Sequence, residues 1–86
     1  MIRMTAARDL SFDTLRLEEA IESGQHIANH RVDAWLDGRW RTIAWGTTIG
    51  NARLHNCAPT TTARLRVVVE FSYAPPSLAR VAAFKA

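Results

Sequence analysis

Hydrophobic and polar residues alternate along several short segments of this chain, as they do in β-strands. The longest alternation covers residues 63–72, in which every second position from Ala63 to Phe71 is apolar. Successive side chains of a strand point to opposite faces, so a period of two predicts a strand with one buried face. Similar patterns over fewer residues predict five more strands, at 12–17, 26–36, 39–45, 52–57 and 78–84.

Turn-forming residues separate these segments. Asp37-Gly38 joins two of them and is a dipeptide that tight β-hairpins favour, because the turn needs positive φ angles. Residues 58–62 predict a turn, and residues 18–25 predict a connecting loop, since Gly24 stops a segment too short for a stable helix. About six short strands with turns between them predict an all-β, antiparallel β-sandwich.

Length and composition limit the chain to one small globular domain. It has 86 residues, of which 48% are hydrophobic, so a disordered chain is excluded. We expect residues 1–11 to be a partly flexible N-terminal segment and residues 12–86 to form the domain. The single cysteine, Cys57, excludes an intrachain disulfide bond.

The net charge of +3 comes from basic residues that are scattered along the sequence. Because they form no stripe, we expect no binding to nucleic acid. Arg64 and Arg66 point outward from the predicted strand at 63–72, either as a solvated sheet face or as a contact for an acidic partner. No apolar run reaches the roughly 18 residues of a membrane span, and the first residues lack a signal-peptide core. We therefore expect no membrane contact and a cytoplasmic location.

Eight groups of residues carry a resemblance to a known family. They are Phe12, 15–19, Ile21, 24–25, 32–40 without Leu36, 46–50, 62–66 and 74–78. Together they resemble the C-terminal β-sandwich of bacterial alpha-L-fucosidases, a discoidin-like (coagulation factor 5/8 type C) member of the galactose-binding-like domains. Enzymes that carry this domain are typically secreted or periplasmic, which differs from the location expected above.

The resemblance implies a jelly roll that is truncated at its N-terminus. The part that supplies the first strands and a calcium-binding loop in this class is not present in the sequence. We therefore expect exposed strand edges that a homo-oligomer would cover, and no cofactor. Galactose-binding domains of this class hold sugar with an Arg and an Asn-Gly in the loop between the first two strands, and glutamates and Ser23 stand there instead.

Catalysis is not expected. Glu18, Glu19 and Glu22 lie close in sequence, and paired carboxylates can hydrolyse glycosides. That chemistry requires two carboxyl groups held across a sugar pocket with different pKa values, which a short loop does not provide. The resemblance places fucosidase catalysis in a separate barrel domain. Only a pocket assembled between subunits would make this chain an enzyme.

Strand directions bring three loops to one end of the sandwich, and we predict a ligand-binding site there. Tryptophan is central to it because aromatic rings stack on the apolar faces of sugars. The predicted ligand-binding residues are Glu19, His26, Trp45, Asn51 and Tyr73. For the other two tryptophans, we predict that Trp40 lies in the core and Trp35 at a protein interface.

Histidines offer a weaker signal. His26, His30 and His55 are interpreted as solvated or edge side chains, with a surface metal cluster as the alternative. No Asp or Cys completes a metal-ligand spacing, so no metal site is predicted.

Taken with the resemblance and the predicted loop-end site, the sequence predicts a non-catalytic carbohydrate-binding module. The alternative is a structural module that has lost its sugar site and forms a homo-oligomer.

Overall fold

The computed structural model describes residues 2–20, 26–50, 52–73 and 78–86. These residues form antiparallel strands that hydrogen-bond in the order β3-β2-β4-β1-β5. The strands are β1 (Ile2–Glu19), β2 (Ile27–Leu36), β3 (Arg39–Gly46), β4 (Arg53–Ser72) and β5 (Leu78–Phe84). The predicted all-β class is confirmed, and the described residues contain no helix that could cross a membrane.

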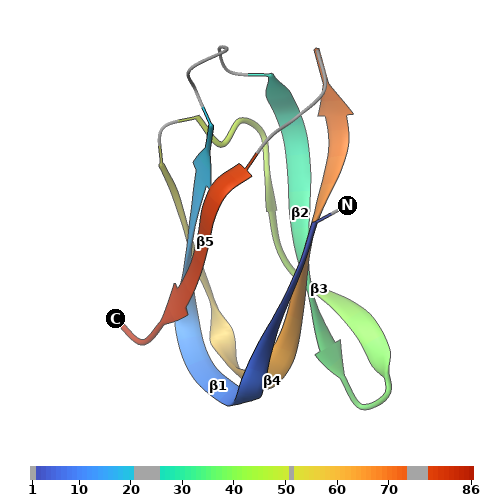
Figure 1. Cartoon of the computed structure of the whole chain (residues 1–86), viewed down its shortest axis with the longest axis vertical. Helices are drawn as coiled ribbons and strands as arrows, with labels where there is room; N and C mark the ends of the chain where they lie inside the picture. Colours follow the sequence, from blue (N-terminus) through green and yellow to red (C-terminus); the bar gives the residue numbers. More distant parts are fainter. Residues whose placement is uncertain (1, 21–25, 51, 74–77) are drawn as a thin grey trace.

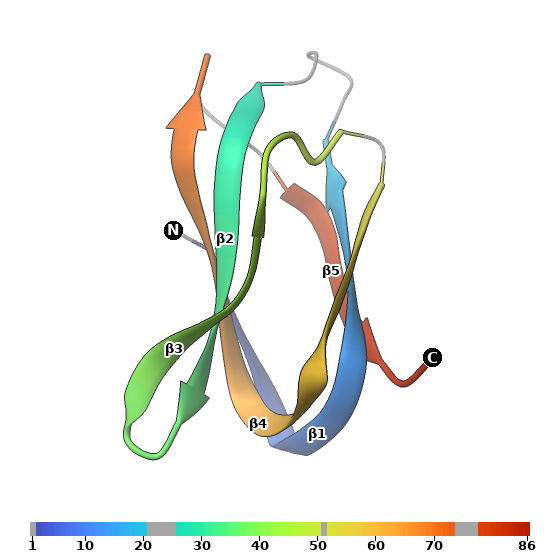
Figure 2. The same cartoon turned by 180° about the vertical axis from the view of Figure 1, so that it is seen from behind.

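Two long, bent strands build both layers of the sandwich. β1 has 18 residues and β4 has 20, and both curve at the bottom of Figure 1. In one layer, the first part of β1 pairs with the last part of β4, and β2 and β3 follow beside β4. The register of β1 against β4 in this layer includes Thr5 opposite Arg64. The second part of β1 pairs with the first part of β4 and with β5. Figure 2 shows the two layers facing each other, which is a β-sandwich.

The predicted strands at 52–57 and 63–72 are one continuous strand. Thr60, Thr61 and Thr62 lie in the segment for which the sequence predicts a turn, yet they pair with residues of β1 at its bend. The boundary at residue 12 between a flexible segment and the domain stays a prediction, although β1 begins at Ile2 and pairs with β4 from there.

The hydrophobic core lies between the two layers. Alternate residues of β1, β2 and β4 point into it, as the period-two patterns predict. Its buried residues are Phe12, Leu15, Leu17, Ile27, Val32, Ala34, Ala44, Ile49, Leu65 and Val67. Each fully buried Leu, Val or Phe side chain stabilises the fold by about 1.5–3 kcal/mol through the hydrophobic effect.

The predicted hairpin between β2 and β3 is confirmed. Asp37 and Gly38 have φ angles of 53° and 77°, the positive values that a two-residue turn of this kind requires. Leu36 then pairs with Arg39, and the register continues along both strands up to Asp33 opposite Thr42. The next pair is Val32 with Ala44, so Ile43 is an extra residue on β3 and forms a β-bulge.

Candidate functional sites

The loop end of the sandwich, at the top of Figure 1, is where the end of β1, the start of β2 and the end of β3 come together. Among the predicted ligand-binding residues, Trp45 is 71% exposed and Tyr73 is 77% exposed. Tyr73 packs edge-on against Phe71 with ring centroids 5.4 Å apart, and its N–H donates to the carbonyl oxygen of His26 over 2.8 Å. Asn51 lies outside the described residues.

Glu19 is buried at this end, and its carboxylate binds the surrounding backbone. It accepts hydrogen bonds from the N–H groups of His26 (2.6 Å), Ile27 (3.1 Å) and Gly50 (3.1 Å). Burial alone would raise the pKa of this carboxyl group, but the three donors together lower it below the usual value. Glu19 therefore joins the end of β1 to the start of β2 and to the loop after β3. Its contact with a ligand stays a prediction.

His30 and His55 correct the interpretation of the histidines as solvated or edge side chains, since both are buried on interior strands. His30 on β2 has 0% exposure and His55 on β4 has 8%. Their Nε2 atoms are 2.9 Å apart, and Nδ1 of His30 is 2.7 Å from the carbonyl oxygen of Thr47. That carbonyl can only accept, so Nδ1 of His30 donates, and in the neutral ring Nε2 then accepts from His55.

A metal at this pair is not supported. Among the described residues, no group of three or more His, Cys, Asp or Glu side chains could hold a metal ion.

The thiol of Cys57 is not activated. Burial raises its pKa, so its reactive thiolate form is disfavoured at neutral pH.

The outer face of the layer that contains β2 and β3 carries a row of aromatic and arginine side chains. Trp40 lies on this face and is half-buried, which corrects the prediction that it belongs to the core. It is opposite Trp35 across the hairpin, with ring centroids 5.2 Å apart and an edge-to-face angle of 75°. The guanidinium of Arg66 lies 4.6 Å from the Trp40 ring centroid, and that of Arg64 lies 5.7 Å from the Trp35 ring centroid.

Asp33 is buried in the middle of this face. Its carboxylate accepts hydrogen bonds from Arg66 Nε (2.7 Å), from Thr42 Oγ1 (2.7 Å) and, at 3.3 Å, from Arg31 Nε. Burial would raise the pKa of Asp33, but these donors lower it below the usual value. Arg66 therefore lies on the outer face and forms an ion pair with Asp33 of its own sheet, whereas the sequence predicted either a solvated face or a contact for an acidic partner.

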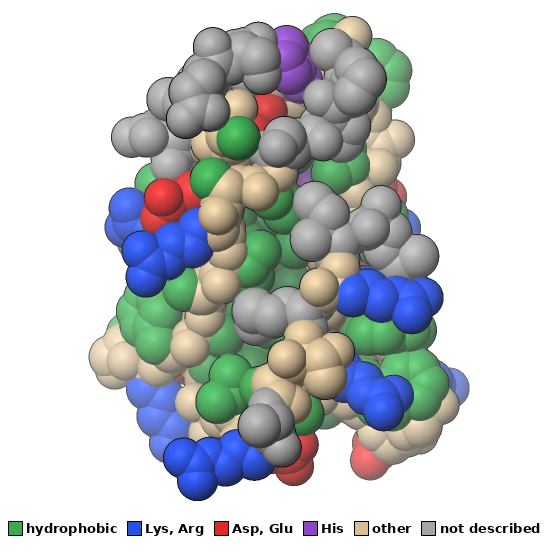
Figure 3. All heavy atoms as spheres, viewed as in Figure 1, with side chains coloured by type: hydrophobic (Ala, Val, Ile, Leu, Met, Phe, Trp, Pro, Cys, Tyr) green, Lys and Arg blue, Asp and Glu red, His purple; other side chains and the backbone are tan. Residues whose placement is uncertain are grey.

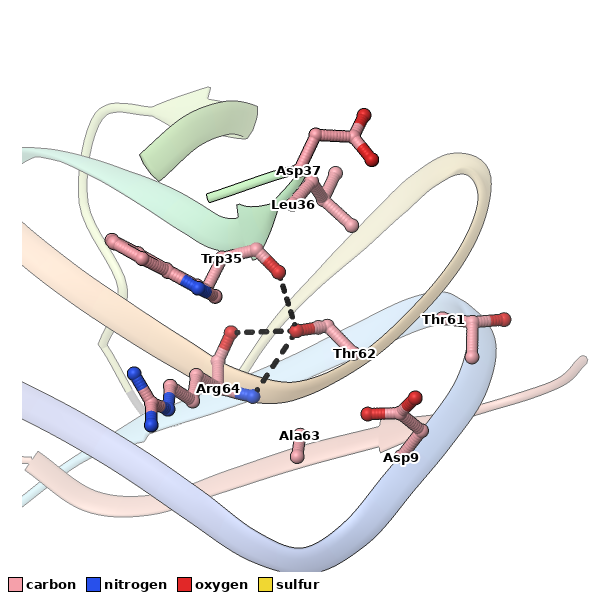
Figure 4. A pocket seen from close by; sticks show the side chains of 8 residues that line it. All are labelled: Asp9, Trp35, Leu36, Asp37, Thr61, Thr62, Ala63 and Arg64. Carbon is pink, nitrogen blue, oxygen red and sulfur yellow. Dashed lines mark hydrogen bonds between the residues drawn. The ribbon is translucent and has the colours of Figure 1, made fainter. Parts of the chain in front are cut away.

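A hollow of about 400 Å³ adjoins this face where the β2–β3 hairpin separates from the bend of β1 and β4. Figure 4 shows Trp35 and Arg64 at one side of it and Asp9 and Thr61 at the other, with Asp37 above. Thr62 is held beneath them, since its hydroxyl donates to the carbonyl oxygen of Trp35 over 2.7 Å. This hollow is at the end of the sandwich opposite the predicted site.

Sequence reasoning missed this hollow because its lining residues come from three distant segments. The signals that could have indicated it are the exposed carboxylate of the hairpin turn and the outward arginines of β4. The carboxylate of the turn and the arginines of β4 come together only because of the register of β2 against β4, in which Asp33 lies opposite Arg66 and Ala34 opposite Leu65. No local pattern predicts that register.

The fold and these sites belong to a chain that resembles one segment of alpha-L-fucosidases. No protein-family profile matches it. A protein of Oryza sativa subsp. japonica, named as a candidate alpha-L-fucosidase, is 46% identical over 44 residues, which are 51% of this chain and 8% of that protein.

Two solved structures extend the resemblance to nearly the whole chain. SpGH29 is 31% identical, with a TM-score of 0.91, over 96% of this chain and 18% of its own. A Ruminococcus gnavus GH29 fucosidase in complex with fucose is 26% identical, with a TM-score of 0.76, over 96% of this chain and 17% of its own. The chain thus spans less than a fifth of the length of each of these proteins.

Proposed function

We propose that this chain is a non-catalytic carbohydrate-binding module of the galactose-binding-like, discoidin type that accompanies alpha-L-fucosidases. The resemblance over 96% of the chain to a minor segment of fucosidases supports a module that accompanies a larger enzyme. The galactose-binding-like, discoidin class and the sugar-binding role go beyond this resemblance and are what we propose.

One observation carries the sugar-binding role, namely the composition of the hollow at the hairpin end. Carboxylates and hydroxyls at Asp9, Asp37 and Thr61 can bond sugar hydroxyl groups, and Arg64 can donate to ring or hydroxyl oxygens. The Trp35 side chain provides apolar surface beside them, as sugar-binding sites commonly require. The polar groups and the aromatic ring therefore lie in one open depression large enough for a sugar residue.

Binding to a panel of neutral and charged oligosaccharides, measured by calorimetry and by tryptophan fluorescence, tests this function. We expect dissociation constants at or below the millimolar range. A folded protein that binds no member of the panel at millimolar concentration would refute the carbohydrate role.

Two matched variants locate the site. Asp9→Asn with Asp37→Asn removes two carboxylates of the hollow and keeps a residue that tolerates the positive φ angle of the turn. Trp45→Ala instead removes the exposed ring of the predicted loop-end site. Loss of binding in the first variant alone assigns the hollow, and loss in the second alone assigns the loop end. Circular dichroism verifies that both variants fold.

Catalysis is tested with a chromogenic fucoside, for which we expect no hydrolysis above the uncatalysed rate. Asp9 and Asp37 both line the hollow but are exposed to solvent. Glycoside hydrolysis requires a carboxyl pair enclosed so that one group stays protonated as a general acid. Turnover that disappears in the Asp9 and Asp37 variant would overturn the non-catalytic assignment.

Self-association is the second proposed function, and the strand order favours it. β3 and β5 are the two edge strands of the described sheet. β5 carries a single charged residue, Arg80, and its Phe84 side chain is 42% exposed. An edge with as little charge as β5 pairs readily with a second chain, whereas β3 carries Arg39 and Arg41. We expect a homo-oligomer by light scattering at micromolar concentration. A monomeric mass over the whole accessible concentration range would exclude this function.

A further inference from the structure

We propose that the outer face of the layer formed by β3, β2, β4 and the first part of β1 binds a negatively charged glycan, one that carries carboxylate or sulfate groups. The contacts would come from the guanidinium groups of Arg3 and Arg64, and Arg66, which is paired with Asp33, lies beside them. This inference rests on the proposed carbohydrate function and names the chemical class of the ligand.

The strand register gathers the three arginines. Arg3 of β1 is directly opposite Arg66 of β4, and Thr5 is opposite Arg64. Residues directly opposite one another in an antiparallel pair point to the same face, and residues two apart on one strand do so as well. Like charges at opposed positions repel each other, so this arrangement is stabilised when an anion lies above it.

The charges on this face do not cancel. Arg31 joins the three arginines on the same face, while the negative groups there are Asp33 and Glu70. Asp33 is buried beneath Arg66, and Glu70 lies 3.5 Å from Arg31. Four positive groups therefore face two negative ones on the strands, apart from Asp9 and Asp37 in the adjoining hollow, and Arg3 and Arg64 are both exposed. A positive surface on a chain with a net charge of +3 attracts polyanions more strongly at low salt.

Aromatic rings hold two of the guanidinium groups in place. Arg66 lies 4.6 Å from the centroid of Trp40, and Arg64 lies 5.7 Å from that of Trp35. Side chains whose positions are fixed before binding lose less conformational entropy when a ligand arrives. Half-buried rings between cationic groups on a sheet suit an extended chain of sugar rings, whose apolar faces contact the rings while its anionic groups meet the arginines.

The hollow fixes the direction of the ligand along this face. Asp9 and Asp37 lie across the hollow from Arg64, so they repel anionic groups and accept hydrogen bonds from neutral hydroxyls. The charged groups of the glycan should therefore lie toward Arg3 and Arg66. Figure 3 shows Lys and Arg side chains at both edges of the view, and Arg80 on β5, in the other layer, provides a control.

The test compares three polysaccharides of similar length: a polygalacturonate, a sulfated galactan and a neutral galactan. Affinities are measured by calorimetry at low and at near-physiological salt. We expect at least one of the two charged polymers to bind about tenfold or more tightly than the neutral one, and its binding to weaken with salt. The two charged polymers distinguish carboxylate from sulfate recognition, and preference for either supports the proposal.

Two sets of variants test whether the preference for charged polysaccharides depends on this face. Arg3→Gln with Arg64→Gln should weaken binding of the charged polymer about tenfold, whereas Arg80→Gln on β5 removes one exposed charge and should leave it unchanged. Asp9→Asn with Asp37→Asn weakens the neutral contacts in the hollow but also removes repulsion of anionic groups, so it should increase the preference for the charged polymer over the neutral one. Arg66 is kept, since it is bound to Asp33.

The outcomes separate this inference from the proposed function. Equal binding of neutral and charged polymers, unaffected by the Arg3 and Arg64 changes, would overturn the inference and leave the carbohydrate function standing. No binding of any glycan would refute both. Tighter binding of single-stranded DNA than of either charged polysaccharide would also overturn the inference, because the face would then be a nucleic-acid surface.

Discussion

Nε2 of His30 and Nε2 of His55 lie 2.9 Å apart, and this hydrogen bond joins the two layers of the sandwich above its apolar core. His30 belongs to β2 in one layer, and His55 belongs to the first part of β4 in the other. A Cβ atom at Gly46 would lie 2.8 Å from Nη2 of Arg53 and 3.1 Å from Cε1 of His55, so a side chain there would crowd both residues. The bond requires Nε2 of His30 to accept from the Nε2–H of His55, so the His30 ring must be neutral.

Acid should weaken the fold through this pair. Burial lowers the pKa of each imidazole below 6.5, and the charge of Arg53 adds to the effect. For His30 the hydrogen bond to Thr47 opposes this shift in pKa most, and Glu70 and Glu19 oppose it less. The unfolded chain therefore takes up protons at a higher pH than the folded chain. Consequently the free energy of unfolding should fall as the pH drops from about 6.5 toward the lowered values. Urea unfolding at several pH values measures this slope.

His55→Gln tests the assignment. Glutamine can still donate to Nε2 of His30 but does not titrate, so the slope below pH 6.5 should become smaller, with a loss of about 1 kcal/mol at pH 8. His26→Gln is the matched control, because His26 is only half-buried and lies outside the pair. An unchanged slope in His55→Gln would show that the pair is not the source of the acid sensitivity.

Elements with a strong local pattern could be predicted from the sequence. The Asp37-Gly38 turn fixed the hairpin, because a two-residue turn determines which residues of its strands face each other. β5 was predicted over the residues it occupies, since alternation and the preceding prolines define it locally. The buried face of the last part of β4 follows from its period of two.

Features that depend on pairing between distant residues could not be predicted. Residues 58–62 contain a proline and three threonines, which favour a turn locally, but pairing with the bend of β1 makes them part of β4. The contact of His30 with His55 spans 25 residues, and that of Arg66 with Asp33 spans 33. Local propensity contains no information on such contacts, which is why polar side chains that looked solvated proved to be buried.

Glu19→Gln should destabilise the loop end strongly. The carboxylate accepts three backbone N–H groups, and an amide would place its own NH₂ group against at least one of these donors. A buried donor without an acceptor costs about 1–3 kcal/mol, so we expect a loss of about 2 kcal/mol in urea unfolding at pH 7. Glu18→Gln, which affects only a surface ion pair with Arg16, should change the free energy of unfolding little. Equal effects of the two changes would contradict the role assigned to Glu19.

Gly38→Ala should destabilise the hairpin although no atom obstructs the new side chain. A Cβ atom at this position meets nothing within 4 Å, but the φ angle of +77° is unfavourable for residues other than glycine. We expect a loss of about 1 kcal/mol in thermal or urea unfolding. Gly38→Asn should lose only a few tenths of a kcal/mol, because asparagine tolerates this conformation better. If the two variants were equally stable, backbone strain would not explain the glycine.

Asp33→Asn should separate the ion-pair network from the shape of the outer face. The amide keeps the size of the side chain but removes the negative charge that compensates Arg66 and Arg31, so we expect a loss of about 2 kcal/mol at pH 7. Because the pKa of Asp33 is lowered in the fold, the stability that it contributes is present above its usual value of 3.8 and is lost as the pH falls below it. The difference between the native protein and the variant should therefore shrink between pH 5 and about pH 2 in urea unfolding. Asp37→Asn, at an exposed carboxylate 3.8 Å from Arg41, is the control and should change neither quantity. A difference that stays constant down to the acid limit would mean that packing, rather than the charge of Asp33, stabilises this face.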